Sequence, residues 1–158
     1  MQIQQIHHDI FVPTGKVFVQ LQNIYTGKII AGLFDNLVTT AGKQSTADHR
    51  RGTTANNKGI ITYCAVGTGS TAPALADTTL QTEIARKLIS VRTVDGKTSV
   101  FQTFFTTSEG NGTLREAGLF GDDASGTANS GTLFCRVAIN RTKSSSDTLT
   151  ILWNVTEG

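Results

Sequence analysis

The chain of 158 residues has few charged side chains: Asp, Glu, Lys and Arg together make up 16% of it, against about 25% in a typical globular domain. Its formal net charge at pH 7 is only +2, and the one basic run is His49-Arg50-Arg51. Nucleic-acid-binding domains usually cluster basic residues on one face. We therefore expect no nucleic-acid partner, and a weakly charged surface is typical of a subunit covered by its neighbours.

Cysteine is scarce, and long apolar runs are absent. Cys64 and Cys135 lie in predicted strands without metal-binding spacing. We expect buried free thiols, although the spacing alone leaves a disulfide between them open. No apolar run approaches the ~20 residues of a membrane span, and residues 1–11 lack the basic and apolar regions of a signal peptide. We therefore expect a soluble protein, made in a cytoplasm, with no membrane partner.

Recognisable catalytic and ligand-binding motifs are also missing. Residues 67–71 (GTGST) follow a strand but lack the lysine of a P-loop and the third glycine of a dinucleotide fingerprint. Asp122-Asp123 lacks the spacing of an EF-hand loop, and His7-His8-Asp9 offers too few ligands on one side of an extended segment for a metal. No serine lies in a G-x-S-x-G motif. The sequence predicts a non-enzymatic protein with no cofactor, no metal and no small-molecule substrate.

Threonine-rich segments with alternating apolar residues dominate the chain. In residues 148–156 the apolar side chains recur at every second position, with only Leu152 breaking the polar row, which is the pattern of a half-buried β-strand. Similar runs predict strands at 17–23, 28–34, 60–67, 83–93 and 97–107, and two more at 113–120 and 132–140. Residues 37–51 are predicted to form one helix capped by Thr39 or Thr40, and residues 77–83 a single helical turn capped by Asp77.

These segments predict a mainly β fold, an antiparallel β-sandwich or open barrel of about eight strands, with one short helix after the first hairpin. Residues 1–13 are predicted to form an N-terminal arm, and residues 14–158 a single β-sandwich domain. The arm either packs as an edge strand or reaches onto a neighbouring subunit through its apolar side chains, Ile3, Ile6, Ile10 and Phe11.

Arg115, Glu116 and Arg136 are charged residues inside otherwise apolar strands. Glu116 and Arg136 lie on the two arms of a predicted hairpin and are expected to face each other, with Glu83 and Arg86 adding to the cluster. Two interpretations stay open: an ion pair within the chain that fixes strand register, and a contact between subunits. The candidate subunit interface therefore comprises the loop 52–59 and Ile3, Ile6, Ile10, Phe11, Arg115, Glu116 and Arg136.

Four stretches of the chain resemble a known family when they are taken in order. They are 36–43 (NLVTTAGK), 65–74 (AVGTGSTAPA) with Asp77, Leu80, Glu83 and Arg86 after it, 115–120 (REAGLF), and 131–137 (GTLFCRV) followed by 143–153 (KSSSDTLTILW). In this order they resemble tailed-bacteriophage virion proteins of the tail, baseplate and fibre-attachment region. The resemblance covers most of the chain and implies a β-rich structural domain without catalytic residues.

The function that the resemblance implies is that of a tail, baseplate or collar adaptor subunit. Such a subunit assembles with itself, as a ring or a trimer, and with other tail, neck or fibre proteins; it is made in the bacterial host cytoplasm and resides in the virion. Many relatives continue into fibre or receptor-binding regions, so the end of this chain at Gly158 favours an adaptor. The alternative is a receptor- or carbohydrate-binding module at a tail fibre, whose site would display exposed aromatic residues in a concave surface.

Overall fold

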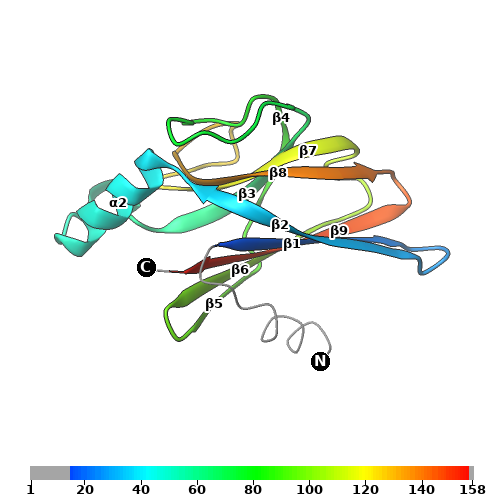
Figure 1. The fold of residues 1–158 in the computed structure, drawn as a ribbon, viewed down its shortest axis with the longest axis horizontal. Helices are drawn as coiled ribbons and strands as arrows, with labels where there is room; N and C mark the ends of the chain where they lie inside the picture. The colour runs from blue at the N-terminus through cyan, green and yellow to red at the C-terminus, as the bar shows by residue number, and fades with distance from the viewer. Residues whose placement is uncertain (1–14, 157–158) are drawn as a thin grey trace.

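The computed structural model describes residues 15–156, in which nine antiparallel strands and one α-helix confirm the predicted mainly β class (Figure 1). The predicted boundary between arm and domain lies outside the described residues. The strands are β1 (Lys16–Asn23), β2 (Ile29–Val38), β3 (Ile61–Gly67), β4 (Glu83–Leu88), β5 (Val91–Asp95), β6 (Thr98–Phe105), β7 (Gly112–Gly121), β8 (Thr132–Lys143) and β9 (Asp147–Thr156). The helices are α2 (Thr40–Arg50) and the short 3-10 helix η1 (Ala55–Asn57).

The nine strands form one sheet, in the order β4-β3-β7-β8-β2-β1-β9-β6-β5, that folds over into two layers (Figure 1). Strand β2 makes the bend, because its first part pairs with β1 and its last residues, Asn36 to Val38, pair with β8. On the opposite side, the edge strands β4 and β5 are joined by only Ile89 and Ser90. The sheet is therefore an open barrel or sandwich whose two layers are connected along both sides, by β2 on one side and by the β4–β5 link on the other.

The link between β4 and β5 explains why the chain has nine strands rather than the eight predicted. Residues 83–93 are extended as expected but change layers at Ile89, whose N–H donates to Thr62 in β3, while the N–H of Ser90 donates to Gln102 in β6. The β-branched residues Ile89 and Val91 lie on both sides of Ser90, so the strand propensity of the segment continues through the break.

The helix and its surroundings differ from the prediction at two places. Helix α2 begins at Thr40 rather than residue 37, because β2 continues to Val38, and Thr39 caps it by accepting the Gly42 N–H. The predicted helical turn over residues 77–83 is wrong: residues 76–82 form irregular turns, and Asp77 accepts the N–H of Ala74 instead of starting a helix. None of the helices in the described residues is long and apolar enough to cross a membrane.

The main core lies between the two layers and takes inward-facing side chains from every strand except β5, whose residues are all exposed. Trp153, the only tryptophan, is fully buried there, as the alternation in β9 predicts. Cys64 and Cys135 both lie opposite Leu119 on the two strands that flank β7. Two strand spacings place their Cα atoms about 10 Å apart, beyond the ~7 Å limit for a disulfide. Both are free thiols, and burial raises the pKa of each to about 12.

Candidate functional site

The outer face of strands β3, β7 and β8 is covered by two long loops, residues 68–82 and 122–131. Three apolar residues of the sheet are buried under these loops together with Leu80 of the loop 68–82: Ala65, Phe120 and Leu133. The alternation of side chains along a strand sends the neighbours of Glu116 and Arg136, such as Ala117 and Val137, into the main core. Glu116 and Arg136 themselves therefore point outward, under the loop 68–82.

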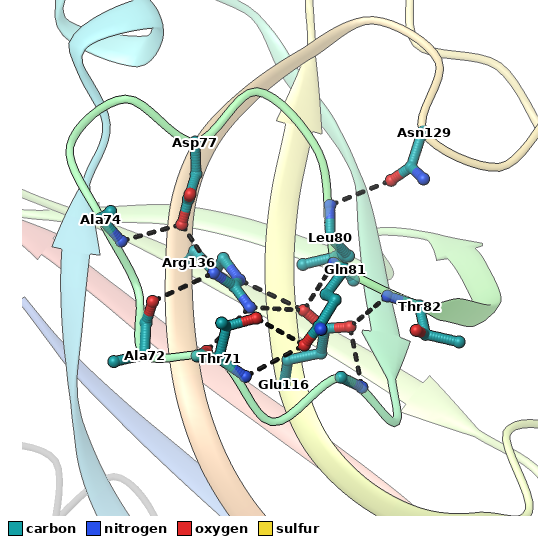
Figure 2. A network of polar contacts seen from close by, with 11 residues as sticks. Thr71, Ala72, Ala74, Asp77, Leu80, Gln81, Thr82, Glu116, Asn129 and Arg136 are labelled. Carbon is teal, nitrogen blue, oxygen red and sulfur yellow. Dashed lines mark hydrogen bonds and ion pairs between the residues drawn. The ribbon is translucent and has the colours of Figure 1, made fainter.

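Glu116 is the centre of this covered face and is 1% exposed. Its carboxylate accepts three backbone N–H groups of the loop: those of Gly69 at 3.1 Å, Gln81 at 2.9 Å and Thr82 at 2.7 Å (Figure 2). It also accepts from Arg136, at 3.2 Å from Nε and 2.9 Å from Nη2. A carboxylate has about four lone-pair sites, so the acceptor capacity of Glu116 is filled.

Arg136, 3% exposed, uses its remaining donors on the same loop (Figure 2). Its Nη2 donates to the carbonyl of Thr71 at 3.0 Å, and its Nη1 donates to Asp77 Oδ2 at 2.6 Å. Burial acts to raise the pKa of Asp77, but the hydrogen bonds from the Ala74 N–H and from Arg136 outweigh it, so that this pKa is lowered. The beginning and the end of the loop 68–82 are thus fastened to one ion pair.

A second ion pair fastens the loop 122–131. Arg86 donates from Nε to Glu83 Oε1 at 2.5 Å and from Nη1 to the carbonyl of Ser125 at 2.9 Å. Its guanidinium also lies over the ring of Phe120, 4.4 Å from the ring centre, an arrangement that stabilises a desolvated cation. Glu83 accepts the N–H of Asn129 at 2.8 Å. Both loops therefore rest on charged residues that the sheet positions.

Asn129 connects the two loops directly. Its side-chain Oδ1 accepts the N–H of Leu80 at 3.0 Å (Figure 2). Its own backbone has a positive φ of 55°, a conformation that asparagine adopts more readily than most residues. The loops 68–82 and 122–131 consequently form one continuous, hydrogen-bonded surface.

The charged residues of this face hold the two loops on the sheet. Glu116, Arg136, Glu83 and Arg86 all have their donors or acceptors occupied by each other and by the backbone of the loops. Within residues 15–156, no group of three or more His, Cys, Asp and Glu residues is placed to hold a metal ion. The arrangement fixes the shape of an exposed loop surface, which makes it a candidate interaction surface.

Asp122 plays the same part for the loop 52–59, and nothing in the sequence pattern had singled it out for this role. Its Oδ1 accepts from Ser45 Oγ at 2.6 Å in α2 and from the N–H of Gly59 at 2.9 Å, and its Oδ2 pairs with Lys58 at 3.0 Å. Burial would raise the pKa of Asp122, but these hydrogen bonds lower it. The predicted subunit-contact loop is therefore anchored at one end to the helix and the sheet.

The other predicted interface residues fall into three groups. Glu116 and Arg136 face each other as expected, in an ion pair within the chain, so the intramolecular interpretation describes them. Arg115 is exposed on the neighbouring position of β7, where a subunit contact stays a prediction. The arm residues lie outside the described residues: Ile3, Ile6, Ile10 and Phe11.

Exposed apolar residues on the layer formed by β2, β1, β9, β6 and β5 were not predicted from the sequence. Leu33 in β2, Val91 in β5 and Phe104 in β6 are 40%, 43% and 41% exposed. Strand register places Leu33 and Val91 on one row across the outer face of that layer, through Phe18, Leu152 and Gln102. The signal was present in the alternation, since the second apolar row of these strands has to face outward when the first fills the core.

Comparison of the chain with protein-family models, with curated proteins and with solved structures finds no match.

Proposed function

We propose that this chain is a non-enzymatic structural subunit of a tailed-phage virion, acting as a tail, baseplate or collar adaptor. In this role it assembles with copies of itself and with neighbouring tail proteins or fibres. It is made in the bacterial host cytoplasm and resides in the virion.

The observation that carries the proposal is that parts of all four stretches resembling phage virion proteins meet at one place in the fold. The second stretch contains the loop that Glu116, from the third, and Arg136, from the fourth, hold on the sheet. The first stretch joins them because the N–H of Thr40 donates to the carbonyl of Leu75 at 2.8 Å. Segments far apart in sequence thus form one structural unit, which supports treating their resemblance as a single feature.

The distribution of exposed apolar residues supports an assembling subunit. Exposed apolar side chains that share one face of a sheet are a candidate contact surface, and Leu33, Val91 and Phe104 all lie exposed on one layer. The carbohydrate-binding alternative calls for aromatic side chains gathered around a hollow. Among residues 15–156, the large exposed aromatics are Tyr25 in the β1–β2 turn and Phe104 in β6, which lie on separate elements.

The proposal is tested by the native mass of the purified chain, measured by light scattering behind a sizing column. A closed ring of several copies is the result expected of a collar or baseplate part, and a trimer that of a fibre-attachment part. A chain lacking residues 1–11 should keep its far-UV circular dichroism and lose assembly, because the arm is proposed to carry a subunit contact. A full-length chain that stays monomeric at millimolar concentration contradicts self-assembly, and binding on a glycan array would then favour the alternative.

A further inference from the structure

A groove of about 330 Å³ opens beside helix α2, at the end of the sandwich where β1 begins. Its floor is apolar and is made by side chains from both layers and from the bend in β2: Val38, Ile61, Phe101, Phe134 and Val155. Pockets of roughly 300–1,000 Å³ accommodate small ligands or a few side chains. The groove is therefore large enough for a short apolar segment.

The rim of the groove is positively charged. Lys43 and Arg50 line it from α2, one on each side of Ala47, and no acidic residue is among the described residues that line it. Lys43 is exposed, as is Ala47. An apolar floor with a cationic rim is complementary to a segment that carries apolar side chains next to a carboxylate.

The first residues of the chain have this composition and are joined to the domain beside the groove. Asp9 is the only acidic residue among residues 1–14, and three apolar residues, Ile10, Phe11 and Val12, follow it directly. Strand pairing of Lys16 with Asn154 places Gly15 beside Val155, on the floor of the groove. Four residues of chain span at most about 14 Å, so Phe11 lies within that distance of Gly15.

We propose that this groove receives the segment Asp9 to Phe11 of a second copy of the chain, with Phe11 on the apolar floor and Asp9 facing Lys43. The inference rests on the proposed self-assembly and names the surface that performs it. A segment that entered the groove of its own chain would link no subunits, so the proposed assembly requires the groove of an adjacent copy.

A disulfide trap tests this geometry directly in the full-length chain. Phe11→Cys and Ala47→Cys are made as separate variants, mixed, oxidised and analysed by mass spectrometry without reduction. A covalent dimer containing one copy of each variant is the expected product. Cys64 and Cys135 should not form disulfides in this experiment, because both are buried and the pKa of each thiol is raised to about 12. Lys28→Cys, at the opposite end of the sandwich, replaces Ala47→Cys in the matched control and should give no such dimer.

A charge exchange tests the polar half of the contact. Lys43→Glu and Asp9→Lys should each weaken assembly by roughly tenfold, and the combined variant should recover it, since the reversed pair restores the attraction. Lys28→Glu makes the same charge change away from the groove and should leave assembly unchanged.

The outcomes separate the failure of this inference from that of the proposed function. If the wild-type chain assembles but neither the trap nor the charge exchange responds, the groove is not the contact and self-assembly stands. If one chain that carries both cysteines closes an internal disulfide and the mixture gives no dimer, the groove holds its own segment, which overturns the exchange between copies. A monomeric wild-type chain contradicts both proposals.

Discussion

Replacing Glu116 with leucine should cost about 3–5 kcal/mol of unfolding free energy, the range found when one partner of a buried ion pair is removed. The structure gives the components of this loss. Three backbone N–H groups, of Gly69, Gln81 and Thr82, lose their acceptor, and each costs about 1–3 kcal/mol if it stays buried and unpaired. Arg136 keeps Asp77 as a partner, and the loop can move to expose its N–H groups, so the loss stays below the full sum.

The measurement is urea unfolding followed by the fluorescence of Trp153, which is fully buried in the main core and reports global unfolding. Since domains are stable by only about 5–15 kcal/mol, the expected loss shifts the midpoint far outside the error of the method. Asp35→Leu is the control: Asp35 pairs with Lys16 but its side chain is 75% exposed, and such pairs contribute about 0–1 kcal/mol. A loss below about 1 kcal/mol for Glu116→Leu would refute the assigned role of this carboxylate.

Partner removal refines the same prediction. In Arg136→Leu alone, the carboxylate of Glu116 stays buried among backbone donors. The double variant, Glu116→Leu with Arg136→Leu, removes both charges and leaves no buried charge without its partner. The cost of the double variant should therefore be smaller than the sum of the two single costs, because the residues are in contact. Strict additivity would show that Glu116 and Arg136 act independently, against the 2.9 Å contact between them.

Three further outcomes follow from single residues. Gly42→Ala should destabilise the fold by about 1–3 kcal/mol despite the higher helix propensity of alanine, because the new Cβ would lie 2.6 Å from the carbonyl oxygen of Phe134; a more stable variant in urea would contradict this packing. Hydrogen bonds, chiefly from Lys87, lower the pKa of Glu109 from 4.5 to about 2. The stabilisation by the Glu109 carboxylate is therefore present above pH 4.5 and is lost as the pH falls toward 2. Glu109→Gln should reduce the decrease of the urea midpoint between these pH values, and an unchanged decrease would contradict this role. Cys64 and Cys135 should resist a thiol reagent in the folded protein and react once it is unfolded, because both are buried; fast reaction of either under native conditions would show that the core opens.

Features governed by neighbours in sequence were predictable. The strand β9 follows from its alternation, since one row of side chains has to enter the core, and the cap at Thr39 follows from the local need of a helix start for an acceptor. The facing of Glu116 and Arg136 was also predictable, because two charges inside apolar strands of one hairpin require partners.

Features governed by distant contacts were not predictable. Asp77 has the sequence context of a helix cap, but Arg136, 59 positions away, takes its carboxylate and the segment stays irregular. The break at Ile89 follows from the closure of the sheet, which pairs β4 with β3 and β5 with β6. Asp122 adopts a positive φ of 52° and binds Ser45 and Gly59, a role that depends on the packing of α2 and not on its own neighbours.

The burial of Glu116 and Arg136 also narrows the places where copies of the chain can meet. The buried carboxylate of Glu116 has all its acceptor sites occupied and cannot accept a hydrogen bond from a second subunit. Exposing it would break the hydrogen bonds that hold the loop 68–82. In the proposed assembly, contacts between copies therefore have to use side chains that are exposed in the single chain. The groove beside α2 satisfies this condition, because Lys43 and Ala47 are exposed at its rim while its floor belongs to the framework. An assembly built there leaves the network of Glu116 and Arg136 intact, so Glu116→Leu should weaken folding, whereas Lys43→Glu should weaken association alone.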